Sequence, residues 1–186
     1  RITYSQGFGV GNRKIELIGE GYFEVKRNEE VPFLVKTNSL LVKVLGTKFN
    51  FRDYPDDAEA IVSLSEGKVA LNNLLKKEKE AFLLPNERVV LNKKNGRMHV
   101  EYSTVSNALQ WTNGYLFFDE ELLPDVVKEL ERSYNVKIQI ASDTLNTFRF
   151  YGNFVHREQN IQEVLEALSA TRKIHYIIEG HNITLY

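Results

Sequence analysis

Apolar and polar residues alternate in short runs along the first 102 residues of the chain. Alternation with a period of two is typical of β-strands that bury one face. The runs that show it are 15–18, 22–26, 32–36, 40–45, 48–52, 60–64, 68–71, 80–84, 88–91 and 97–102. Turn-forming residues separate them, as at 55–57 and 95–96. We therefore predict an all-β domain over residues 1–102, folded as a sandwich or as a twisted, solenoid-like stack.

The pattern changes after residue 102, and we predict a linker over 103–110 and a second domain over 111–186. Short strands are predicted at 115–118, 136–140, 148–154, 174–178 and 182–186. The last two would form a hairpin around residues 179–180. Two helical patterns interrupt the strands, so the predicted order is β-α-β-β-α-β-β. This order describes a small α+β domain of ordinary size.

Local signals define both helices. Pro124 suits the first turn of a helix, where its missing N–H costs nothing. One apolar face follows at helical spacing and consists of Leu123, Val126, Val127, Leu130 and Tyr134. Asn135 can end this helix because asparagine tolerates the left-handed conformation. Asn160 and Glu163 have the spacing of a capping box at the start of the second helix.

Composition narrows the classes of function. Hydrophobic residues make up 42% and charged residues 26% of the chain, which is ordinary for a globular protein. The chain contains no run of about 18 apolar residues, so no membrane span is predicted. The absence of cysteine excludes disulfides, thiolate nucleophiles and cysteine-type zinc sites. A net charge of −1 argues against nucleic-acid binding, which uses a basic excess. Because the chain begins at Arg1 and shows no signal peptide, we expect it to be part of a longer protein.

Candidate motifs for catalysis or cofactor binding are weak. The GFGVG segment at residues 7–11 has Asn12 where a dinucleotide loop needs its third glycine, and a strand pattern rather than a helix follows it. We interpret it as a loop. The histidines form no metal-binding spacing, although His175 and His181 could face each other across the final hairpin. We predict no catalytic, cofactor-binding or metal site, and we predict that the protein is not an enzyme.

The segment VLGTKFNFRDYPDD at residues 44–57 allows two interpretations. Its first half alternates as a strand does, with Phe49 and Phe51 expected on the core side. Its second half gathers Asp53, Asp56 and Asp57, which could hold a cation. Pro55 followed by an aspartate is a turn signature, so we favour a polar turn between two strands.

The order of these motifs resembles a known family. Residues 15–71 contain GEGYFEV, VPFLV, VKVLGTKFNF and LSEGKVAL, which resemble the periplasmic region of FecR-type anti-sigma regulators. Residues 111–140, WTNGYLFFDEELLPDVVKELERSYNVKIQI, resemble the C-terminal domain of the Bacteroidetes members. That domain is similar to the secretin/TonB short N-terminal domain, which has the predicted order of strands and helices. The first β-segments of the family, which normally precede residues 2–4, are not in this sequence.

The resemblance implies a role in signalling. Such a protein would be the periplasmic portion of a single-pass inner-membrane regulator. It would relay a signal from the signalling domain of an outer-membrane TonB-dependent receptor to an extracytoplasmic-function sigma factor, which is bound by a cytoplasmic domain outside this sequence. No cofactor, no nucleic acid and no direct membrane contact of this portion are implied.

The residues add a candidate surface for the receptor contact. In the predicted strand 148–154, Phe148, Phe150 and Phe154 would share one face. Arg149, Tyr151 and Asn153 would share the other, and we predict that they contribute to partner binding by a small domain with exposed edge strands. A covered central strand would remove this possibility. The alternative function is a cell-envelope carbohydrate-binding or scaffolding module, which would use exposed aromatic rings to stack on sugars.

Overall fold

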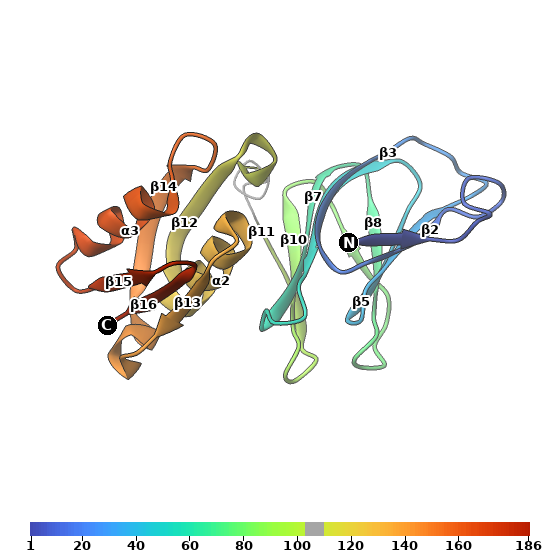
Figure 1. The fold of residues 1–186 in the computed structure, drawn as a ribbon. Helices are drawn as coiled ribbons and strands as arrows, with labels where there is room; N and C mark the ends of the chain where they lie inside the picture. The colour runs from blue at the N-terminus through green and yellow to red at the C-terminus, as the bar shows by residue number, and fades with distance from the viewer. Residues whose placement is uncertain (103–109) are drawn as a thin grey trace. The chain divides into compact units, whose positions relative to one another are not determined.

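The computed structural model describes residues 1–102 and 110–186 (Figure 1). The chain divides into two compact units, Arg1–Leu109 and Gln110–Tyr186, and each is described by itself. The predicted linker 103–110 lies outside the described residues, apart from Gln110.

The first unit is built from two β-sheets. The six-stranded sheet has the order β1 (Ile2–Tyr4), β2 (Lys14–Leu17), β4 (Phe33–Lys36), β5 (Leu40–Val44), β8 (Val69–Asn73) and β9 (Ala81–Leu83). The five-stranded sheet has the order β11 (Met98–Tyr102), β10 (Glu87–Asn92), β7 (Glu59–Glu66), β6 (Thr47–Asp53) and β3 (Gly19–Val25). Neighbouring strands are antiparallel, except that β2 and β4 are parallel.

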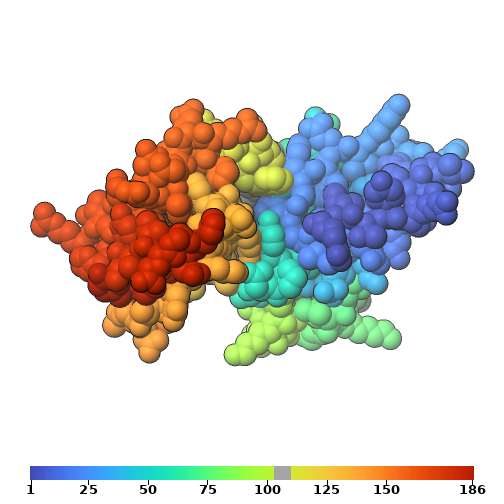
Figure 2. All heavy atoms as spheres, viewed as in Figure 1, coloured from blue at the N-terminus to red at the C-terminus, as the bar shows by residue number. Residues whose placement is uncertain are grey.

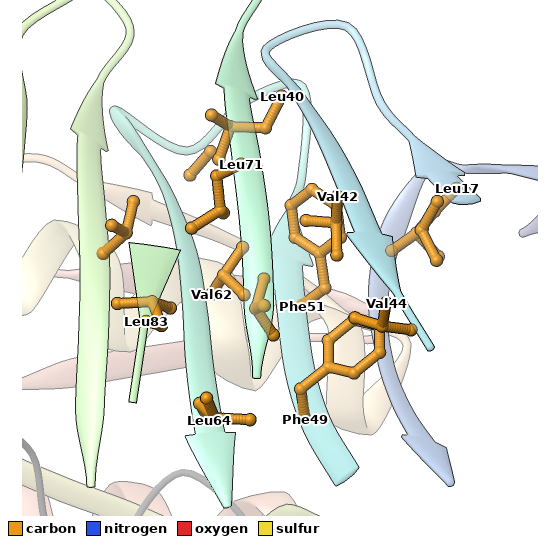
Figure 3. Packing of buried hydrophobic residues seen from close by; sticks show 14 of the residues in the cluster. Leu17, Leu40, Val42, Val44, Phe49, Phe51, Val62, Leu64, Leu71 and Leu83 are labelled. Carbon is orange, nitrogen blue, oxygen red and sulfur yellow. The ribbon is translucent and has the colours of Figure 1, made fainter. Parts of the chain in front are cut away.

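One apolar core joins the two sheets. Phe49 and Phe51 of β6 are fully buried and face Val42 and Val44 of β5, as Figure 3 shows. Strands such as β4, β5 and β8 place every second side chain in this core, because side chains alternate between the two faces of a strand. The arrangement is a sandwich, which confirms the predicted β-rich class of this region. Gly46 lies between β5 and β6, where a Cβ atom would be only 2.6 Å from the Arg27 Cα atom.

The second unit combines strands with two α-helices among its described residues. Its elements are η1 (Gln110–Asn113), β12 (Tyr115–Leu122), α2 (Leu123–Tyr134), β13 (Lys137–Ile140), η2 (Asp143–Thr147), β14 (Arg149–Val155), α3 (Ile161–Ser169), β15 (Tyr176–Glu179) and β16 (Asn182–Leu185). Strands β12 and β14 form one sheet, and β13, β16 and β15 form another in that order. This is a small α+β unit, as the sequence predicts at the level of fold class.

The helix ends confirm the local sequence signals. Pro124 lies in the first turn of α2, and Asn135 ends that helix in the left-handed conformation with φ 52°. At the start of α3, the Asn160 side-chain oxygen accepts the Glu163 backbone N–H at 3.1 Å. The Glu163 carboxylate accepts the Asn160 backbone N–H at 2.8 Å, which completes the capping box.

One predicted strand end is wrong, and one pairing that the sequence left open does not occur. Strand β12 does not stop at residue 118 but continues to Leu122 through a β-bulge, in which Glu120 adopts a left-handed φ of 55°. His175 and His181 do not face each other. His175 pairs with Tyr186 through two backbone hydrogen bonds, because the hairpin turns at Gly180, between the cross-strand partners Glu179 and Asn182.

Gly152 shapes the core side of β14. Three phenylalanine rings pack around it, with the Phe150 and Phe154 rings stacked at a centroid distance of 6.1 Å and Phe118 lying against both. A Cβ atom on Gly152 would lie 2.5 Å from the Phe150 ring and 2.8 Å from the Phe154 ring. Glycine is therefore needed here for space rather than for an unusual backbone angle.

Gly152→Ala is expected to lower the free energy of unfolding of the second unit by about 1–3 kcal/mol, because the added methyl group forces two buried rings to move. Urea unfolding of the variant and the parent, followed by circular dichroism, measures the difference. Gly7→Ala is the matched control, since nothing lies within 4 Å of a Cβ atom at Gly7. Equal losses in the two variants would contradict the packing argument.

Candidate partner-binding surface

Two of the three aspartates of residues 53–57 form ion pairs with basic side chains. Asp53 is the last residue of β6 and is buried, and its Oδ1 atom lies 2.7 Å from Lys93 Nζ. Lys93 also donates a hydrogen bond to the Tyr54 backbone carbonyl. The lysine ammonium thus occupies the position where a bound cation would balance the Asp53 charge.

Asp57 is held by a different cation. Arg52 Nε donates to Asp57 Oδ2 at 2.9 Å, and Arg52 Nη1 lies 3.4 Å from Glu20 Oε2. The Asp57 backbone N–H donates to the Tyr54 carbonyl at 3.2 Å, which closes the turn between β6 and β7. The segment is therefore the predicted turn, and two of its three aspartates neutralise basic residues.

The other features that could indicate a metal site, a membrane span or a cofactor loop have no such role in the described structure. Among the described residues, no group of three or more histidine and acidic side chains could hold a metal ion. Within the same residues, no helix is long and apolar enough to cross a membrane. The glycine-rich segment forms exposed turns, with hydrogen bonds from Phe8 N–H to the Ser5 carbonyl and from Gly9 N–H to the Asn12 carbonyl.

The predicted surface residues lie on the open face of the β12–β14 sheet. Phe150 and Phe154 of β14 are buried in the core of the second unit. Arg149, Tyr151 and Asn153 alternate with them and are exposed, with 59% of Tyr151 accessible. Among the described residues, β14 pairs with β12 alone, so it is not a central strand.

Strand β12 adds residues to this face that the sequence did not single out. Phe117 lies directly opposite Asn153, and Tyr115 follows on the same face. Their exposed fractions are 38% and 39%. Together with Tyr151 they form what we call the aromatic face, which consists of Tyr115, Phe117, Arg149, Tyr151 and Asn153. The exposed positions of β12 become recognisable only when the strand pairing is known.

The bulge in β12 fixes the polar atoms at one end of the aromatic face. Arg149 Nη1 donates to the backbone carbonyl of Glu120. The hydrogen bond between the Tyr151 hydroxyl and the Glu120 carboxylate is the main cause that raises the pKa of the Tyr151 phenol above its usual value, and the nearby Asp119 charge adds to it. Tyr151 is therefore neutral at physiological pH and can donate or accept hydrogen bonds.

Comparisons with known proteins give one consistent answer. The family model described as "FecR protein" matches residues 1–70, and the one described as "FecR, C-terminal" matches residues 115–185. One similar crystal structure, at 1.65 Å, is of a protein described as a putative anti-sigma factor from Parabacteroides distasonis ATCC 8503. The sequence of that protein is 32% identical to this chain. The structure matches with a TM-score of 0.88 over 100% of this chain and 85% of that one. The chain belongs to the FecR family.

A second crystal structure with the same description, at 2.50 Å, gives the same identity and TM-score and is covered over 84% of its length. A comparison with curated protein sequences gives no significant match. The likeness to the solved structures extends over both units of this FecR-family chain, so the family assignment does not rest on one unit alone.

A shallow hollow borders the aromatic face of this FecR-family chain at Arg149. Its volume is about 510 Å³, and its lining residues are Thr144, Leu145, Thr147, Phe148, Arg149 and Lys173. Lys173 Nζ lies 5.6 Å from the centroid of the Phe148 ring. The hollow is lined by two cationic side chains, Arg149 and Lys173, and by two threonine hydroxyl groups.

Lys93→Met is expected to lower the free energy of unfolding of the first unit by about 3 kcal/mol, because the buried Asp53 carboxylate loses its counter-charge. Chemical unfolding monitored by circular dichroism measures the loss. Lys94→Met, at the neighbouring exposed position, should change stability by no more than about 0.5 kcal/mol. A Lys93→Met variant as stable as the control would show that the ion pair does not stabilise the fold.

Proposed function

We propose that this chain is the sensing portion of a membrane-anchored anti-sigma regulator that acts in the periplasm. It relays a signal from an outer-membrane TonB-dependent transducer to an extracytoplasmic-function sigma factor, which a separate cytoplasmic domain binds. The observation that carries the proposal is the match to a protein described as a putative anti-sigma factor, which covers the whole of this chain with 32% identity and a TM-score of 0.88. The FecR family matches in both units support it.

In this function the chain consists of two domains. Residues 1–102 form the FecR-like β domain, and 111–186 form a domain of the secretin/TonB short N-terminal type. The chemistry of the second unit suits recognition. Its surface offers aromatic rings and hydrogen-bonding groups held by a rigid sheet, which are the features that protein interfaces use.

In this proposal the aromatic face contacts the signalling domain of the receptor. Aromatic and arginine side chains supply much of the binding energy at protein interfaces, because they bury large areas and keep polar groups at their tips. Tyr151 and Arg149 have both properties, and Glu120 holds each of them in place. Asn153 and Phe117 continue the surface along the paired strands.

Arg149→Glu combined with Tyr151→Ala is expected to weaken binding of the receptor signalling domain by about tenfold to a hundredfold, because it removes one aromatic contact and reverses one charge. Isothermal titration calorimetry with purified signalling domains of TonB-dependent receptors from the same organism measures the affinity. Both positions are exposed, so the fold of the variant should be unchanged by circular dichroism.

The matched control is Lys137→Glu with Tyr186→Ala, which makes the same kinds of change at an exposed position of the other sheet and at the exposed residue that follows its strand β16. Its affinity for the signalling domain should equal that of the parent chain. If the aromatic-face variant also binds as the parent does, this face is not the receptor contact. If the parent chain itself does not bind the signalling domain, the relay function is wrong.

A carbohydrate-binding or scaffolding module is the second candidate, and one observation favours it. Three exposed rings, Tyr115, Phe117 and Tyr151, share one sheet face, and aromatic faces of this kind can stack on sugars. Binding to a glycan array at micromolar affinity, lost in Phe117→Ala, would support this function. Absence of glycan binding together with specific capture of the signalling domain would support the relay instead.

A further inference from the structure

Strand β15 leaves an apolar edge exposed at the end of a sheet. It is the outer strand of the sheet β13-β16-β15, and β16 is the only described strand with which it pairs. Ile177 and Ile178 are 50% and 40% accessible. Figure 2 shows the C-terminal hairpin, in dark red, at the surface of the second unit. Lysine and proline, which usually protect edge strands, are absent from Tyr176–Glu179.

The backbone of β15 is prepared to pair on its outer side. His175 and Tyr186 exchange two hydrogen bonds, from His175 N–H at 2.9 Å and from Tyr186 N–H at 3.0 Å. In an antiparallel ladder, the next residue along the strand directs its N–H and C=O groups away from the partner strand. Tyr176 and Ile178 therefore present four backbone groups outward.

This edge is complementary to itself in one antiparallel register. The register pairs Tyr176 with Ile178 of a second copy, and by symmetry Ile178 with Tyr176 of that copy. All four outward groups on each chain then form backbone hydrogen bonds across the edge. Ile177 lies opposite Ile177 of the second copy, on the two-fold axis.

The side chains are also complementary in this register. Tyr176 packs partly against the core of the second unit, and Ile178 points to the same side of the strand, so the aromatic and β-branched side chains meet across the edge. On the other side, His175 lies opposite Glu179 of the second copy, and the imidazole N–H can donate to the carboxylate. The pair occurs twice, once on each side of the central isoleucines.

We propose that two copies of this chain associate through their β15 strands and join two three-stranded sheets into one continuous six-stranded sheet. The association covers Ile177 and Ile178 and satisfies the outward backbone groups. The interface involves only five residues of each copy, far less than the roughly 20–30 per side of a standard protein interface. The dimer is therefore weak, with a dissociation constant on the order of 100 µM.

Sedimentation velocity of the chain over concentrations on both sides of this value tests the proposal. Ile177→Lys places two ammonium groups opposite each other on the two-fold axis and should raise the dissociation constant by at least about tenfold. Ile18→Lys is the matched control, because Ile18 is an isoleucine of the first unit with 41% of its surface accessible. It should leave the dissociation constant unchanged.

Exchanging the charges of the pair His175 and Glu179 distinguishes this register from other modes of association. His175→Glu places two carboxylates opposite each other and should weaken the dimer, while His175→Glu with Glu179→Lys should restore it. A chain that stays monomeric at all concentrations would overturn the proposal, and so would an edge occupied only by a strand of another protein. A dimer that is unaffected by Ile177→Lys, or not restored by the double change, would show that association uses another surface.

Discussion

The alternation of side chains along strands that bury only one face is the constraint on which this structure depends. In β6 it places Phe49 and Phe51 in the core of the sandwich. In β14 it places Phe150 and Phe154 in the core of the second unit. A shift of one residue in either strand would expose these rings and bury polar groups, so the register is fixed by the free energy of burial. The identity of the exposed residues follows from the same constraint.

Much of the fold was predictable because this alternation can be recognised from residues that are close together in the sequence. The strands of the first unit, the end of α2 at Asn135 and the capping box of Asn160 and Glu163 all depend on neighbours within a few positions. The exposure of Arg149, Tyr151 and Asn153 was predictable for the same reason, since it follows from their alternation with buried phenylalanines.

What the sequence could not provide depends on residues far apart in the chain. The contact between Asp53 and Lys93 joins residues 40 positions apart, and no local pattern indicates it. The continuation of β12 to Leu122 passes through three consecutive acidic residues, which interrupt the apolar alternation. Phe117 could be assigned to the aromatic face only after its partner Asn153 was known. Whether His175 and His181 face each other could not be decided from the sequence, because the position of the turn sets the register of the hairpin.

The two proposed surfaces of the second unit bind in different ways, one through side chains and the other through backbone hydrogen bonds. On the aromatic face the backbone of β12 and β14 is paired, so side chains such as Tyr151 and Phe117 carry recognition and can select one partner. At the β15 edge the outward backbone groups carry the contact, and main-chain pairing is tolerant of sequence. Selectivity there rests on few side chains, Ile177 on the axis and the pair of His175 and Glu179. A weak edge contact between identical copies is therefore compatible with a side-chain contact to a different protein on the other sheet.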